Sequence, residues 1–235
     1  STIAVNISVM SALIGNDTVL IDSDKNTKSS SKFISHRNDK GITPTPSCFQ
    51  IYGQSLHVEI EKLANKYDVV IIDVGGADSV ELRSALSSPF VADLYSPVQT
   101  SDFDLETLES VDELTYLSQS YNKNLKTHIV FNSCSSHPAN NLVVDATELI
   151  DQFDHINRLL PILTHRVAFS YSISHHQSVI EFEYSKMENM PKWQSGKYSA
   201  KASKEMALLY NEIMKEKFNI PKFNTAFFNK KEVMA

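Results

Sequence analysis

Residues 68–76 read Asp-Val-Val-Ile-Ile-Asp-Val-Gly-Gly, and this stretch decides the fold. Its four consecutive β-branched residues predict a strand that is covered on both faces and carries Asp73 at its carboxyl end. Three further short runs have a similar form: 18–21 before Asp22, 91–95 before Ser96, and 128–131 before Asn132. Strands of this kind are typical of a parallel sheet that is buried between helices.

Helical periodicity appears between these strands. Apolar residues recur every three or four positions over residues 3–14, 56–63, 102–121 and 200–218. Because strands that alternate with helices favour right-handed crossovers, we expect an α/β fold with a doubly wound, mostly parallel β-sheet flanked by helices. The Ser- and Lys-rich residues 25–31 and the polar residues 186–199 are predicted to be loops.

Length and composition predict a sizeable core. The chain has 235 residues, 42% of them apolar, and a formal net charge of −6. We expect a single domain over residues 1–235, with residues 219–235 as an extended C-terminal tail. Since the total charge is negative, any DNA contact has to come from a local basic patch.

Cysteine usage and hydropathy indicate the compartment. Cys48 and Cys134 are too few for a disulfide framework, which is typical of a reducing environment. No stretch approaches the roughly 20 apolar residues that span a bilayer, and the N-terminus has no basic region followed by an apolar one. We therefore expect a cytoplasmic location with no stable membrane insertion, and Pro221 disfavours a membrane-binding helix in the tail.

The order of these motifs resembles the ParA/MinD family of P-loop ATPases with a deviant Walker A motif. Residues 1–6, Ser-Thr-Ile-Ala-Val-Asn, are similar to the end of the family's phosphate-binding loop and the start of its first helix. Residues 19–24, Val-Leu-Ile-Asp-Ser-Asp, are similar to its acidic strand end. The glycine-lysine turns of that loop are not in the sequence, and we expect the first strand and most of the loop to be missing upstream of Ser1.

The resemblance implies a site for ATP and Mg²⁺. In it, Ser1 and Asp73 hold Mg²⁺, and Thr2 donates to a phosphate at a helix N-terminus. Gly75 and Gly76 let the backbone approach the γ-phosphate. Many family members have two prolines at this place, so the Asp-Val-Gly-Gly sequence favours the plasmid-partition branch.

The remaining implied roles concern catalysis and the base. Asp22 and Asp24 are implied to act near the γ-phosphate and its attacking water, and Asn132 to hydrogen-bond the adenine edge. Residues 161–169 are similar to the next strand and the segment that flanks the base. Gln99, Ser101 and Asp102 fit the family's loop near the dimer face.

Each candidate residue also has a common structural explanation when it is taken alone. Ser1-Thr2 suits a helix cap, Asp22 and Asp24 suit an acidic turn, and Asn132 is a frequent turn residue. Their order along the chain favours a site, because a doubly wound sheet gathers its strand ends at one edge. We therefore expect Asp22, Asp73 and Asn132 to converge.

Two other patterns are disfavoured. Cys134-x-x-His137 has a metal-like spacing, but no second pair completes a zinc site. His175-His176 lies near two serines that lack the glycines of a nucleophile elbow.

The resemblance implies a ParA-like ATPase in plasmid or DNA partitioning or transfer. Such a protein forms an ATP-dependent homodimer, binds DNA non-specifically, and hydrolyses ATP when a partition-partner protein stimulates it. The DNA-binding candidates are Lys192, Lys197, Lys201 and Lys204, for which a solvated helix face is the alternative. The alternative function is a non-catalytic ParA-like interaction module without a phosphate-binding loop. A ligase of the same fold requires a substrate pocket for which the sequence shows no motif.

Overall fold

The computed structural model describes residues 1–76, 78–137, 141–191, 194, 198–216 and 218. Within them the chain forms two compact units, which we describe separately. Unit 1 consists of residues 1–50, 67–74 and 166 onward, and unit 2 of residues 51–66 and 75–165. The assignment of residues 1–235 to one domain stays a prediction, and the proposed tail, 219–235, lies outside the described residues.

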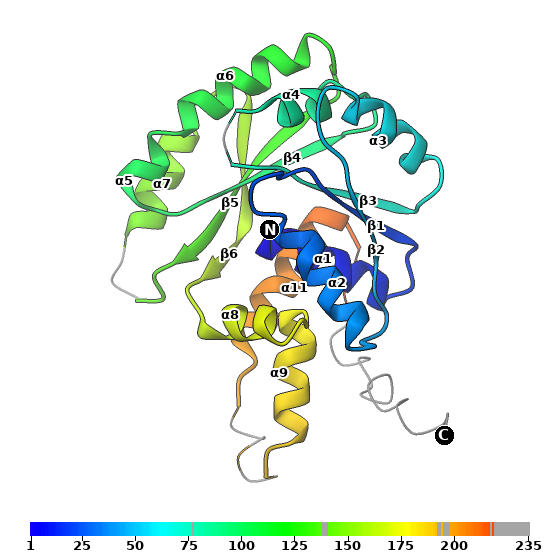
Figure 1. Ribbon diagram of the computed structural model, residues 1–235. Helices are drawn as coiled ribbons and strands as arrows, with labels where there is room; N and C mark the ends of the chain where they lie inside the picture. The colour runs from blue at the N-terminus through cyan, green and yellow to red at the C-terminus, as the bar shows by residue number, and fades with distance from the viewer. Residues whose placement is uncertain (77, 138–140, 192–193, 195–197, 217, 219–235) are drawn as a thin grey trace. The chain divides into compact units, whose positions relative to one another are not determined.

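Unit 1 is built on a parallel three-stranded sheet in the order β2-β1-β3 (Figure 1). The strands are β1 (Thr18–Asp22), β2 (Ser47–Gln50) and β3 (Val69–Asp73). β1 and β3 confirm the predicted strands. β2 has no counterpart among them, because its four residues contain no apolar run. The helices of the unit are α1 (Thr2–Leu13), α2 (Ser29–Asp39), α8 (Val167–Ser174), α9 (Val179–Glu188) and α11 (Lys201–Met214).

Helix α1 is buried round its whole circumference in the middle. Every residue from Val5 to Ser11 is buried, whereas Ile14, the last residue of the predicted apolar stripe, is 37% exposed. The buried Asn6 side chain donates to the Thr2 carbonyl at 2.8 Å and accepts from the Val179 N–H at 2.7 Å. A helix covered on all sides suits the core when its polar groups find such internal partners.

Helix α2 begins where the sequence predicts a loop. Residues 29–31, the end of the predicted Ser- and Lys-rich loop, form its first turn. Its buried residues are Ser30, Phe33, Ile34 and Arg37, which follow the i, i+3, i+4, i+7 spacing of one helix face. Only Phe33 and Ile34 are apolar, so a hydropathy pattern does not reveal this buried face of the helix. Phe33 and Ile34 pack with residues of α1, β1 and β3 in the core of unit 1.

The buried guanidinium of Arg37 joins α2 to α9. It bonds both carboxylate oxygens of Glu181, at 2.6 and 2.9 Å, and both side chains are fully buried. It also donates to the carbonyls of Pro44 and His176. Glu181 completes a capping box with Ser178 at the start of α9. The pair therefore satisfies a helix cap and two carbonyls at once.

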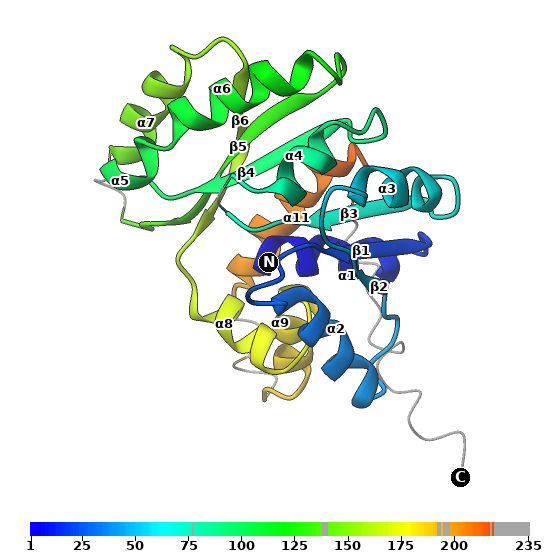
Figure 2. The same ribbon diagram turned by 45° about the horizontal axis from the view of Figure 1, so that its top comes forward.

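Unit 2 contains a second parallel sheet, in the order β4-β5-β6. Its strands are β4 (Asp93–Val98), β5 (Lys126–Cys134) and β6 (Ile156–Thr164). Its helices are α3 (Leu56–Ala64), α4 (Val80–Leu86), α5 (Asp102–Leu105), α6 (Leu108–Gln119) and α7 (Leu142–Ile150). Helices α6 and α7 cover one face of the sheet, where they share a core with β5 (Figure 2).

Several predicted boundaries in the sequence are corrected. The predicted helix over 102–121 is two helices, because the chain turns at residues 106–107. β4 begins two residues later than expected, and β5 continues past Asn132 to Cys134. Of residues 161–169, likened to a strand and the segment after it, 161–164 end β6 and 167–169 begin α8. α9 extends to Glu188, into the predicted loop over 186–199.

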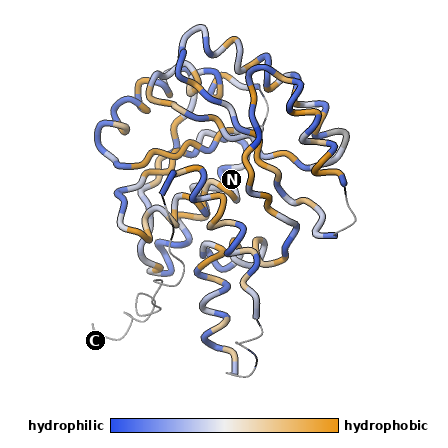
Figure 3. Tube along the Cα trace, turned by 180° about the vertical axis from the view of Figure 1, so that it is seen from behind, coloured by the Kyte–Doolittle hydropathy of each residue, from blue (hydrophilic) through white to orange (hydrophobic). Residues whose placement is uncertain are grey.

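Both sheets are parallel and flanked by helices, which confirms the predicted α/β, doubly wound fold class. The helices carry hydrophobic and hydrophilic residues together, as the hydropathy colours of Figure 3 show. Within the described residues, no helix has the length and apolar character needed to cross a membrane.

Replacing Arg37 with Met is expected to lower the free energy of unfolding by about 3–5 kcal/mol, because Glu181 then stays buried without its counter-charge. Urea denaturation followed by circular dichroism measures the change. Arg83→Met is the matched control, since Arg83 pairs with Asp78 on the surface, and it should leave the urea midpoint almost unchanged. Equal midpoints for the two variants would contradict the role given to Arg37.

Candidate functional site

A row of polar side chains closes the carboxyl edge of the unit 1 sheet. Asp22 is the last residue of β1, and its register partners are Gln50 on β2 and Asp73 on β3. The alternation of side chains along a strand places them on the face that carries Leu20, Cys48 and Ile71. That face packs against α1 and α2. The row therefore ends beside the first turns of these helices.

The two carboxylates are buried and receive hydrogen bonds from the first turn of α2. Asp22 is 0% exposed and Asp73 is 7% exposed. The hydroxyl of Ser30 donates to Oδ2 of Asp73 at 2.5 Å, and the N–H of Ser31 donates to Oδ2 of Asp22 at 2.8 Å. The Ser31 hydroxyl in turn accepts from Gln50 at 2.9 Å. Sequence reasoning misses both serines, because it assigns residues 25–31 to a loop.

The start of α1 lies at the same edge. The Ser1 nitrogen is 3.2 Å from Oδ1 of Asp73. Ser1 occupies the N-cap position of α1, and within the described residues its side chain makes no capping hydrogen bond. Ser1 and Thr2 are exposed. The free N–H groups of a helix's first turn attract anions, so this end of α1 suits a phosphate.

Asp24 lies beyond the strand and has partners of its own. Its carboxylate accepts from the N–H groups of Asn26 and Thr27 and, at 2.7 Å, from the Thr27 hydroxyl. The Thr27 hydroxyl bond, followed by the Asn26 N–H bond, lowers the pKa of Asp24. β1 ends at Asp22, and the carboxylates of Asp22 and Asp24 accept hydrogen bonds from different donors.

The remaining nucleotide candidates belong to unit 2. Gly75 and Gly76 follow β3 in the chain, and a Cβ atom added at Gly76 would meet nothing within 4 Å. Asn132 is half-buried on β5. The next residue, Ser133, has φ = 57°, which is unusual for a residue other than glycine, and its hydroxyl lies 3.1 Å from Nδ1 of His165.

Two of the four candidate DNA-binding lysines are described. Lys201 and Lys204 are exposed on the same face of α11, whose opposite face buries Met206 and Tyr210. This confirms the amphipathic pattern predicted for the helix. Lys192 and Lys197 lie outside the described residues.

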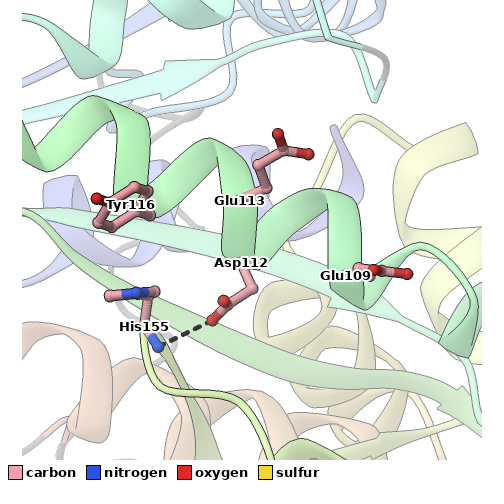
Figure 4. A pocket seen from close by; sticks show the side chains of 5 residues that line it. All are labelled: Glu109, Asp112, Glu113, Tyr116 and His155. Atoms are coloured by element: carbon pink, nitrogen blue, oxygen red, sulfur yellow. Dashed lines mark hydrogen bonds between the residues drawn. The ribbon is translucent and has the colours of Figure 1, made fainter.

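Unit 2 also has an open pocket of about 470 Å³ that the sequence does not predict. Glu109, Asp112, Glu113 and Tyr116 line it from α6, and His155 lines it from the segment before β6 (Figure 4). Asp112 accepts from the N–H of His155 at 2.8 Å, and the rings of Tyr116 and His155 are 5.0 Å apart. Among the described residues, no three His, Cys, Asp or Glu side chains form a metal-binding group.

The Cys48 thiol is affected by the charges of Asp22 and Asp73. Burial, followed by the negative charges of Asp22 and Asp73, raises the pKa of the Cys48 thiol from 9.0 to about 12. The cysteine is therefore a protonated thiol at neutral pH, and its reactivity depends partly on two carboxylates of the site.

Alkylation of Cys48 at pH 8 is expected to be about 10³-fold slower in the folded protein than in urea, because each pKa unit removes about a factor of ten in thiolate. Mass spectrometry resolves this thiol from Cys134. Asp73→Asn should speed the reaction by removing one repelling charge, though not to the unfolded rate, since burial persists. Asp39→Asn, an exposed change on α2, is the control. Equal rates in the Asp73 and Asp39 variants would contradict the charge effect.

Solved structures resemble the chain, whereas no protein-family model and no curated protein matches it. The McdA–ATP complex of Cyanothece has a TM-score of 0.63 and 12% identity over 92% of this chain and 93% of that one. The MinC:MinD cell division protein complex of Aquifex aeolicus has a TM-score of 0.60 and 14% identity over 93% and 91%. A putative plasmid partition protein of Borrelia burgdorferi B31, bound to AMPPNP, has a TM-score of 0.53 and 14% identity over 77% and 89%.

At these identities the likeness concerns the fold, and it extends over most of the chain. The likeness of these structures to the chain confirms the ParA/MinD-like fold that the order of the motifs implied. The chain has the α/β fold of the ParA/MinD-like P-loop ATPases.

Proposed function

We propose that this protein is a ParA-like ATPase that acts in plasmid or DNA partitioning or transfer. In this proposal it binds ATP with Mg²⁺, forms an ATP-dependent homodimer in the cytoplasm, and binds DNA non-specifically in that state. A partition-partner protein stimulates hydrolysis and so releases the DNA. The observation that carries the proposal is the pair of buried carboxylates, Asp22 and Asp73, at the edge where α1 and α2 begin.

The chemistry of this edge fits Mg²⁺ and a phosphate. The carboxylates of Asp22 and Asp73 are oxygen donors, which Mg²⁺ prefers. The first turn of α1, next to Asp73, adds N–H groups that attract anions. A cation at this edge offsets the repulsion between two carboxylates that parallel pairing places side by side.

The residues then have distinct tasks. Asp73 and Ser1 hold Mg²⁺, which neutralises phosphate charge when it is bound. Thr2 donates to a phosphate, and Gly75 and Gly76 give the backbone room at the γ-phosphate. The carboxylate of Asp22 or of Asp24 orients the attacking water, and Asn132 pairs with the adenine edge.

Asp22→Asn and Asp24→Asn test the catalytic assignment in the full-length natural protein. The amide oxygen can still accept from the Ser31 N–H in Asp22→Asn, or from the N–H groups of Asn26 and Thr27 in Asp24→Asn. Each change therefore removes the charge and one of the two accepting oxygens. The variant that loses the water-orienting carboxylate should hydrolyse ATP about 10²-fold more slowly, with ATP binding retained. Phosphate release measures the rate, and calorimetry measures the binding.

Asp39→Asn serves as the matched control, since this carboxylate is exposed at the end of α2. Wild-type hydrolysis in both test variants would remove Asp22 and Asp24 from catalysis. A full-length protein that binds no Mg·ATP would overturn the ATPase proposal as a whole.

The DNA-binding proposal depends on the exposed lysines of α11. The logarithm of the affinity falls linearly with the logarithm of the salt concentration, and each lysine that neutralises a phosphate makes this slope steeper by about 0.9. Lys201→Ala with Lys204→Ala should therefore reduce this slope by about 2 and weaken binding to any duplex sequence. Fluorescence anisotropy in a salt series with ATP measures it. The control is Lys62→Ala with Lys123→Ala, two exposed lysines of unit 2, and equal slopes for the two double variants would refute the assignment.

A further inference from the structure

The two oxygens of the Asp73 carboxylate face the starts of two different helices. Oδ2 accepts from the Ser30 hydroxyl at the start of α2, and Oδ1 lies 3.2 Å from the Ser1 nitrogen at the start of α1. Ser30 is 0% exposed, so water does not compete for its hydroxyl. The hydroxyl has a single proton, and its bond to Oδ2 fixes which oxygen turns toward α1.

The position of Ser30 is itself fixed at a distance. Ser30 and Arg37 lie seven residues apart on the buried face of α2, with Phe33 and Ile34 between them in the core. Arg37 anchors the far end of this face through Glu181 and the Pro44 carbonyl. Because a helix with both ends held neither slides nor rotates freely, Ser30 presents its hydroxyl to Asp73 in one geometry.

We propose that Ser30 is a positioning residue for the Asp73 carboxylate and thereby sets the affinity for Mg²⁺. This inference rests on the proposed ATPase function, because it uses the same carboxylate. Ser30 holds Oδ2, and Oδ1 is left to the metal beside α1. Partners that orient a ligand in this way influence metal affinity without touching the metal.

Three variants of the full-length protein test the role. Ser30→Ala removes the hydroxyl, Ser30→Thr keeps a donor at the same place, and Ser29→Ala makes the same chemical change at the exposed neighbour. Binding of a fluorescent ATP analogue is titrated with Mg²⁺ and, separately, in EDTA. Thermal denaturation reports any loss of folding.

In Ser30→Ala, the Mg²⁺ concentration for half-maximal nucleotide binding should rise about 10–100-fold, as for other lost partners of metal ligands. Binding in EDTA should stay unchanged. Ser30→Thr should restore most of the Mg²⁺ affinity, and Ser29→Ala should match the wild type. A wild-type Mg²⁺ dependence in Ser30→Ala, or an equal loss of binding in EDTA, would overturn the positioning role.

Crystal structures of the nucleotide-free wild type and Ser30→Ala give a readout that does not depend on ATP. The Asp73 carboxylate should rotate or adopt two conformers in the variant. If it keeps its orientation, the inference is wrong even when Mg·ATP binds. If it rotates but the wild type binds no Mg·ATP, the ATPase proposal fails, while the contact between Ser30 and Asp73 still positions the carboxylate.

Discussion

The pairing of two buried carboxylates is the constraint on which unit 1 depends. β1 and β3 are parallel and in register, so Asp22 and Asp73 end adjacent strands side by side. Burial removes water from both, and like charges in a poorly polarisable interior repel. The unit compensates with two hydrogen-bond donors from α2, the Ser31 N–H and the Ser30 hydroxyl, and the Ser1 nitrogen lies 3.2 Å from Asp73. The same arrangement makes this edge a natural place for a cation and a phosphate.

Helix α2 connects this edge to the rest of unit 1. Its buried stripe is polar at both ends, with Ser30 on the carboxylate side and Arg37 at the far end. A buried ion pair is weak evidence for stability in itself, because desolvation offsets much of its attraction. The Arg37–Glu181 pair also makes hydrogen bonds to a helix cap and to two carbonyls. These bonds fix the orientation of α2. Residues that are far apart in the sequence thus link the geometry of the site to α9.

The similar solved structures and the chemistry of the sheet edge support the ATPase proposal by two separate arguments. Shared architecture shows how the strands are arranged, and it does not identify the ligand. The oxygen donors, the burial of the carboxylates and the start of α1 supply the chemical part of the case. In unit 2, Ser133 lies next to Asn132 near the end of β5 and has a left-handed backbone conformation.

The sequence by itself determined the strands made of consecutive β-branched residues and the helices whose apolar residues recur every three or four positions. It also determined the acidic residues that end β1 and β3. It determined these because residues 18–22 and 69–73 carry their signal locally, in composition and spacing. Only the tertiary structure decided that α2 exists as a buried helix, that β2 joins the sheet, and that Ser30 meets Asp73. Those features depend on partners far away in the chain, 43 residues for Ser30 and 144 for Arg37, and no local pattern encodes a hydrogen bond across such a separation.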